Sequence, residues 1–130
     1  MSGLVPYLHF SGSAREALTA YHGIFGGDLT LHTLADFGRT DGPPEAIAHG
    51  ILSGPVDLFG ADAGPDDDPL VLQGVLFSLL GAADPDTLAV WFDALADGGS
   101  VKDPLQARPW GAHDGQVVDR FGVTWLIGYE

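Results

Sequence analysis

The spacing of apolar residues changes from the period of a strand to that of a helix and back within the first half of the chain. Between residues 13 and 25 apolar side chains recur every three or four positions, which predicts a helix with one apolar stripe. Ser13 and Glu16 have the spacing of a capping box at its start, and Gly26-Gly27 predicts its end. Short apolar runs around this helix predict strands at 5–10, 28–35, 47–52 and 56–59, in the order β-α-β-β-β.

The second half of the chain repeats this order. Asp84 and Pro85 give a helix an N-cap residue followed by proline at its first position. Pro104 and Pro109 restrict one predicted strand to a short or edge position, because proline cannot donate to a sheet ladder. The apolar stripe of the helix is Leu88, Trp91, Phe92 and Leu95, and Gly98-Gly99 predicts its end. The predicted strands are 70–80, 101–108, 116–118 and 123–129.

Both halves end in a similar turn followed by a strand. Asp119-Arg120-Phe121-Gly122 predicts a tight turn before the last apolar run, and residues 54–60 form a fainter copy. Aligning the copies places Gly54 on Gly122, Leu58 on Leu126 and Gly60 on Gly128. We therefore predict one α+β domain, residues 1–130, made of two βαβββ modules that form cupped mixed sheets. The modules span about 4–62 and 70–130, and a polar segment at about 61–69 joins them.

Composition narrows the classes of partner. The chain has 5 Lys+Arg against 18 Asp+Glu, a net charge of −13, which disfavours nucleic acids and anionic membrane surfaces. It contains no cysteine, so a disulfide framework or a thiolate nucleophile is excluded. The start of the chain does not have the pattern of a signal peptide, and no apolar run approaches the roughly 20 residues that span a bilayer. We expect an acidic, soluble, cytoplasmic protein.

Several short motifs spread over the chain occur together in one known group of proteins. Two βαβββ modules with these motifs resemble the vicinal oxygen chelate superfamily of glyoxalases, extradiol dioxygenases and bleomycin-resistance proteins, and more closely its PhnB-like branch. Branch members are sometimes described as methyltransferases, but the chain has no Gly-rich turn suited to a methyl-donor cofactor. The motifs are Pro6-Tyr7-Leu8-x-Phe10, Ala14-Arg15-Glu16-Ala17, Phe25-Gly26-Gly27, His49, Asp62, Ala94-Leu95-Ala96-x-Gly98-Gly99, Pro104-Leu105-Gln106, Trp110-Gly111 and Asp119-Arg120-Phe121-Gly122-Val123-x-Trp125.

The resemblance also implies where a metal would bind. In the metal enzymes of the superfamily each module supplies two ligands, from its first and last strands. The corresponding positions here are the apolar residues Pro6, Leu58, Val75 and Leu126, which cannot bind a divalent ion. A register slip of one residue would bring in at most His9 and Asp57. We therefore expect neither a metal nor another cofactor.

Five residues are predicted to bind a ligand. His49 stands between two small residues and either faces a cavity or is a buried histidine bonded to a backbone carbonyl. Trp110 offers a flat wall for a planar ligand or simply covers a sheet edge, and His113 lies on the connection after it, where a surface position is the alternative. His9 is a further pocket candidate. Phe77 lines either the helix layer or the cavity.

The predicted function is binding of a small organic ligand in an apolar cavity between the sheets by a glyoxalase-like, PhnB-like protein of unassigned reaction. The alternative is a metal-dependent lyase, isomerase or dioxygenase with a rearranged site made of His9, His49 and a carboxylate. We also expect a homodimer, as is common for this fold. The sequence leaves open the ligand, any catalytic residue, and whether one chain or two form each cavity.

Overall fold

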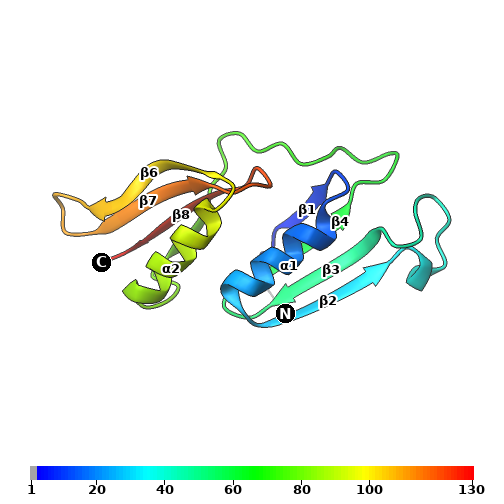
Figure 1. The fold of residues 1–130 in the computed structure, drawn as a ribbon, viewed down its shortest axis with the longest axis horizontal. Coiled ribbons are helices and arrows are strands. Elements are labelled where there is room, and N and C mark those ends of the chain that lie inside the picture. The colour runs from blue at the N-terminus through cyan, green and yellow to red at the C-terminus, as the bar shows by residue number, and fades with distance from the viewer. Residues whose placement is uncertain (1–2) are drawn as a thin grey trace. The chain divides into compact units, whose positions relative to one another are not determined.

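The computed structural model describes residues 3–130, so Met1 and Ser2 of the predicted domain lie outside it. The chain forms two compact units that meet between Leu70 and Val71. Each unit has a four-stranded mixed sheet and a long helix, in the order β-α-β-β-β, which confirms the predicted α+β class and fold (Figure 1). The elements are β1 (Tyr7–Phe10), α1 (Ala14–Phe25), β2 (Asp28–Thr33), the 3-10 helix η1 (Ala35–Phe37), β3 (Ile47–Ser53), β4 (Leu58–Asp62), β5 (Phe77–Leu80), α2 (Pro85–Ala96), β6 (Ser100–Ala107), β7 (His113–Val118) and β8 (Thr124–Tyr129).

In the first unit the strand order is β1-β4-β3-β2, with β1 parallel to β4 and the other pairs antiparallel. Leu8, Gly60 and Gly50 lie side by side on the face that α1 covers. A Cβ on Gly50 would meet the end of the Leu18 side chain on α1, and a Cβ on Gly60 would lie 3.1 Å from the Phe10 ring and 3.3 Å from Leu18. The helix therefore packs closely on this face, and every second residue of each strand points away from it.

The start of α1 differs from the prediction. Among the described residues the Ser13 side chain makes no capping hydrogen bond, so the Ser13 half of the predicted capping box is wrong. The acceptor comes from β4 instead: Asp62 Oδ1 accepts from the backbone N–H of Ala14 at 3.0 Å, and its Oδ2 accepts from that of Ile47 at 2.8 Å. One carboxylate thus fixes the first turn of the helix to the start of β3.

In the second unit the strand order is β5-β8-β7-β6, again with one parallel pair, β5 and β8. The cap of α2 is as predicted, since Asp84 accepts from Thr87 N–H at 2.8 Å and Pro85 follows it. The strand that contains Pro104 is the edge strand β6, and its pairing with β7 is irregular on both sides of Asp103, as the proline predicted. The four residues of the predicted apolar stripe are all buried: Leu88, Trp91, Phe92 and Leu95.

The turn before β8 is organised by one buried carboxylate. Asp119 accepts from the backbone N–H groups of Phe121 and Val123 at 2.8 and 3.1 Å, and from the indole Nε1 of Trp125 at 2.9 Å. The predicted turn is therefore correct, but its first residue also anchors the core tryptophan of the unit. Trp125 is among the largest fully buried side chains of the described protein.

Two predictions about the second unit are wrong. The apolar run 70–80 was expected to be one strand, yet β5 begins only at Phe77, and Val71 is 80% exposed. The alignment of the repeat is also off by one residue. Leu58 is buried on the α1 side of its sheet, whereas Leu126 lies between the buried Trp125 and Ile127 and faces away from α2. A shift of one residue places Leu58 on Trp125, so that like faces correspond.

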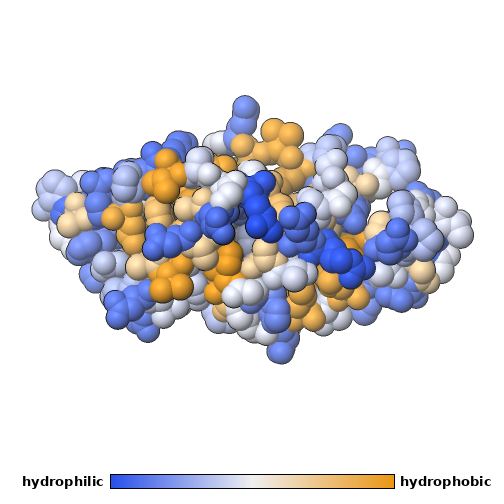
Figure 2. Space-filling view, in the orientation of Figure 1, coloured by the Kyte–Doolittle hydropathy of each residue, from blue (hydrophilic) through white to orange (hydrophobic). Residues whose placement is uncertain are grey.

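The surface agrees with the acidic composition. Figure 2 shows polar side chains over much of both units, with apolar residues in separate groups between them. The exposed large apolar side chains include Val71, Val90 and Trp110.

Candidate functional site

Four ring side chains gather on the face of the first sheet that α1 does not cover. Tyr7 and His9 come from β1, His49 from β3 and Phe59 from β4. The Tyr7 ring is stacked on His49 with 5.5 Å between ring centroids, meets His9 edge-on at 5.4 Å, and lies 6.0 Å from Phe59. His49 and Phe59 are 5.4 Å apart. We call Tyr7, His9, His49 and Phe59 the ring cluster.

Strand alternation places these rings together. Tyr7 pairs with Phe59 between β1 and β4, and each neighbours a residue that faces α1, Leu8 or Gly60. On β3 the same applies to His49, because the next residue, Gly50, faces Leu18. Residues two apart on a strand point to the same side, so His9 joins Tyr7. The close approach of α1 on one face therefore determines which side chains occupy the other.

A hydrogen bond joins two members of the ring cluster. The Tyr7 hydroxyl and His49 Nδ1 are 3.0 Å apart. Partial burial, and after it the charge of Asp67, raise the pKa of Tyr7 above its ordinary value, while Arg39 opposes the shift. Tyr7 is nevertheless 46% exposed, so a large apolar ring with a polar tip remains open to a ligand. The alternative for His49, a bond to a backbone carbonyl, is replaced here by a bond to a side chain.

The second unit contains the other three predicted residues. Trp110 and His113 line a depression of about 470 Å³ at the end of the sheet, where β5 and β8 end and β7 begins. His113 is the first residue of β7 and its ring is stacked on Tyr129, so the expectation that it lies on a connection is wrong. Phe77 meets the buried Trp125 edge-on at 5.5 Å, which resolves its two alternatives in favour of the helix layer.

A further depression in the first unit, of about 630 Å³, contains two of the five Lys and Arg side chains. Both already have partners, since Arg15 donates to the carbonyl of Glu45 and Arg39 forms a two-bond ion pair with Asp41. Asp62 also lines it, with its oxygens bonded to Ala14 and Ile47. We find no reason in these contacts to assign a ligand to this depression.

The side chains present do not fit a metal held by this chain. Within residues 3–130 there is no group of three His, Cys, Asp or Glu that could hold an ion. Of the positions carried over from the superfamily, Leu58 and its neighbour Pro6 belong to the α1 side, and Val75 precedes β5. Leu126, the fourth of these positions, pairs with Ser78 on β5.

Sequence reasoning missed three of the residues described here: Tyr7, Phe59 and Tyr129. Tyr7 entered only as part of a motif, although its i, i+2 spacing to His9 on a strand already placed the two on one face. Phe59 needed the β1–β4 register, and Tyr129 needed the pairing of His113 with β8. Those pairings join residues far apart in sequence, so local spacing does not contain them.

Comparison with known proteins identifies relatives and the fold. No protein-family model matches the chain. Protein YjdN of Escherichia coli (strain K12) is 29% identical over 140 residues, covering 95% of this chain and 92% of the relative. A PhnB protein from Bacillus cereus, described as a putative 3-demethylubiquinone-9 3-methyltransferase, shares the fold with a TM-score of 0.77 at 17% identity, over 99% of this chain and 100% of that one. A glyoxalase/bleomycin resistance protein from Albidiferax ferrireducens T118 does so with a TM-score of 0.63 at 12% identity, over 99% of each.

The crystal structure of protein PA1353 from Pseudomonas aeruginosa is similar in both sequence and fold. It is 35% identical, covers 100% of this chain and 98% of its own, and gives a TM-score of 0.80. The chain is thus related to PA1353, and it has the fold of the glyoxalase/bleomycin resistance proteins. The likeness in fold to PhnB-like and glyoxalase-like proteins agrees with the resemblance that the sequence motifs indicated. A shared fold brings no reaction with it, because one fold hosts many activities.

The described helices do not include a membrane-spanning candidate, since none from residue 3 onward is long and apolar enough to cross a bilayer.

Proposed function

We propose that the chain binds a small organic molecule with a flat, apolar part on the ring cluster of its first sheet, without a metal ion held by the protein. The ligand stacks beside Tyr7, and the Tyr7 hydroxyl and the His49 imidazole orient its polar group. One observation supports this above all: a half-exposed tyrosine is held between His49, His9 and Phe59 on a sheet face that α1 leaves free.

The chemistry of the cluster favours an aromatic or otherwise planar ligand. Aromatic pairs in stacked or edge-on geometry contribute about 0.5–1.5 kcal/mol beyond the area they bury. Tyr7 and His49 are already stacked, with an interplanar angle of 22°, so a third ring can extend the stack without reordering them. Because the Tyr7–His49 hydrogen bond fixes both side chains, little conformational entropy is lost on binding.

A direct test is an NMR titration with 2-naphthol and its saturated counterpart decahydro-2-naphthol. We expect 2-naphthol to shift the Tyr7 ring and His49 imidazole signals saturably and to bind more tightly than the saturated alcohol. Tyr7→Ala and His49→Ala should each weaken binding about two- to tenfold, the range of one aromatic contact. Val90→Ala, on the exposed side of α2, is the control and should leave the affinity unchanged. Equal binding of both alcohols, or no effect of either variant, would contradict the proposal.

The alternative function is a metal-dependent lyase, isomerase or dioxygenase that uses His9, His49 and a carboxylate. Both histidines contact the Tyr7 ring, which favours this alternative, but no third donor joins them in the part of the chain that is described. Elemental analysis of protein purified without chelator separates the two functions. We expect zinc, nickel, manganese and iron well below one ion per chain; a stoichiometric ion lost in His49→Ala would establish the alternative.

We also propose a homodimer. Sheets of this kind have edge strands that can pair with another chain, here β1 and β2 in the first unit and β5 and β6 in the second. Sedimentation equilibrium at micromolar concentration should give twice the chain mass of 13.6 kDa. A monomer mass under these conditions would rule the dimer out.

A further inference from the structure

The depression at the end of the second sheet has features of a separate binding site. Its volume, about 470 Å³, lies within the range of small-molecule sites. All residues that line it belong to the second unit, so it does not include the ring cluster of Tyr7. The residues that matter for its chemistry are Leu80, Trp110, His113, Asp114, Tyr129 and Glu130.

Trp110 is presented on an ordered turn. The turn between β6 and β7 is closed by the hydrogen bond from Arg108 N–H to the carbonyl of Ala112 at 2.7 Å, and by that from Gly111 N–H to the carbonyl of Arg108 at 3.0 Å. At the tip Trp110 is 72% exposed, unlike Trp91 and Trp125, which are buried. Tryptophan is enriched at binding surfaces, because its ring is apolar and its N–H can find an acceptor there.

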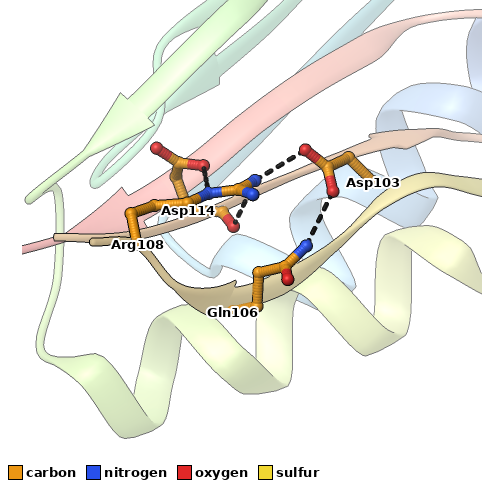
Figure 3. A network of polar contacts seen from close by, with 4 residues as sticks. All are labelled: Asp103, Gln106, Arg108 and Asp114. Carbon is orange, nitrogen blue, oxygen red and sulfur yellow. Dashed lines mark hydrogen bonds and ion pairs between the residues drawn. The ribbon is translucent and has the colours of Figure 1, made fainter. Parts of the chain in front are cut away.

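The guanidinium of Arg108 fixes this turn. Its Nε donates to Asp114 Oδ1 at 2.8 Å, its Nη2 donates to Asp103 Oδ2 at 2.6 Å, and Gln106 donates to the other oxygen of Asp103 (Figure 3). These two carboxylates raise the pKa of Arg108 above its ordinary value. One guanidinium between two carboxylates leaves the network with a net negative charge.

The electrostatic character of the depression is therefore negative. The charged side chains in its lining are Asp114 and Glu130, both carboxylates, and the chain as a whole carries −13. An indole face beside carboxylates attracts an organic cation, through the ring quadrupole and through charge. An anionic ligand would be repelled by the same groups.

One imidazole nitrogen in the lining lacks a partner. The His113 ring is held against Tyr129, with 4.7 Å between centroids and an interplanar angle of 15°. Its Nδ1 is buried, and no hydrogen-bond partner for it exists among the described residues. Because Nδ1 is buried, it is not open to a ligand in the depression, and His113 contributes to the lining through its stacked ring.

We propose that this depression binds a primary organic ammonium whose apolar body lies against Trp110. The carboxylates of Asp114 and Glu130 attract the charge, and the stacked rings of His113 and Tyr129 provide a further flat wall. The depression shares no lining residue with the ring cluster, so each proposal can be refuted without affecting the other.

The test compares benzylammonium with benzyl alcohol, which has the same ring and a neutral polar group. At pH 7 we expect benzylammonium to shift the indole Nε1–H signal of Trp110 saturably in the 15N spectrum of the full chain. Benzyl alcohol should bind at least about fivefold more weakly, because it lacks the charge that the carboxylates attract. Raising the salt concentration to about 0.5 M should weaken benzylammonium binding, because the carboxylates are partly exposed.

Three variants refine the test. Trp110→Ala should weaken benzylammonium binding about two- to fivefold, whereas Trp110→Phe, which keeps a ring face, should retain most of it. Glu130→Gln should weaken it about twofold, and Val90→Ala, on the exposed side of α2, should have no effect. The proposal is overturned if benzyl alcohol binds as tightly as benzylammonium, if the shifts map to residues outside the depression, or if Trp110→Ala, with an unchanged circular dichroism spectrum, binds as the wild type does.

Discussion

The two units reach the same element order by fixing their helices in different ways. The first N–H of α1 is bound by Asp62, which lies 48 residues further along the chain, on the strand that pairs with β1. The first turn of α2 is capped by Asp84, whose side chain accepts a hydrogen bond from the backbone N–H of Thr87, three residues later. One helix therefore depends on the completed sheet for its start, and the other carries its own signal.

The units also differ on the sheet faces that their helices leave free. In the first unit this face carries the ring cluster, with a hydrogen bond between Tyr7 and His49. In the second unit the corresponding strands present Ser78, Gln116 and Leu126. A common scaffold thus supports aromatic recognition in one copy only, and the second unit places its exposed aromatic residue, Trp110, on a turn instead. The following predictions test this comparison, from the largest effect to the smallest.

Removing the buried carboxylate of the second unit should have the largest effect. Asp119→Ala leaves the N–H groups of Phe121 and Val123 and the indole of Trp125 without their acceptor. We expect a loss of about 4 kcal/mol in the free energy of unfolding, because each buried unsatisfied donor costs roughly 1–3 kcal/mol. Urea unfolding followed by tryptophan fluorescence measures it. Asp93→Ala, on the exposed side of α2, is the control, and an equal loss in both variants would contradict the assigned role.

Glycines at corresponding positions of the two sheets should respond differently to alanine. A Cβ on Gly115 would lie 2.6 Å from the backbone nitrogen of Leu105, so the neighbouring strand has to move. On Gly50 it would meet the end of the flexible Leu18 side chain. We expect a destabilisation of about 3 kcal/mol for Gly115→Ala and about 1 kcal/mol for Gly50→Ala, within the usual range for overpacking. Thermal unfolding of both variants measures the two losses. A larger loss for Gly50→Ala would show that β6 shifts more easily than α1 to make room for the added methyl group.

The two helix caps give a third comparison. Asp62→Ala removes an acceptor for both Ala14 and Ile47, and we expect a loss of about 2 kcal/mol in the free energy of unfolding. Asp84→Ala should lower the free energy of unfolding by less, because that carboxylate is exposed and accepts from the single N–H of Thr87. Asp62→Asn keeps one carbonyl oxygen and should fall between Asp62→Ala and the wild type. Hydrogen exchange at the first turn of each helix locates the effect; faster exchange in α2 on changing Asp62 would refute the assignment.

The pH dependence of the ring cluster should be the smallest effect. Burial raises the pKa of Tyr7 above 10.0, so the folded protein favours the neutral phenol. Its contribution to stability is therefore complete below the ordinary value of 10.0 and is lost as the pH rises through the higher folded value. The difference in tyrosinate absorbance between wild type and Tyr7→Phe should show a tyrosine that titrates above 10.0. A difference curve centred below that value would contradict the burial of Tyr7.

Local signals in the sequence account for the parts of the fold that were predicted correctly. The helix stripes, the cap of α2 and the edge strand with Pro104 each depend on residues within one or two turns of each other. The capping box at Ser13 failed because a distant carboxylate, Asp62, took its place. The repeat was aligned one residue out because matching glycines does not reveal which face a strand residue occupies.

The candidate site was also predicted only where a local signal in the sequence pointed to a residue. His49 and His9 stand out as imidazoles among apolar neighbours, and the structure brings both against Tyr7. Tyr7 and Phe59 look like ordinary core residues until the parallel pairing of β1 with β4 is known. Their binding roles, like those of Trp110 and His113, remain predictions that the titrations above address.

The position of Asp62 has a consequence for the order of events during protein synthesis. The ribosome makes α1 well before it makes the carboxylate that binds the first N–H of that helix. A nascent α1 is therefore without its cap until β4 has been translated and has left the exit tunnel, whereas α2 is complete as soon as its own residues emerge. A translational pause placed just before Asp62 would prolong the period in which the apolar side of α1 is available to chaperones, and one placed just after α2 would not.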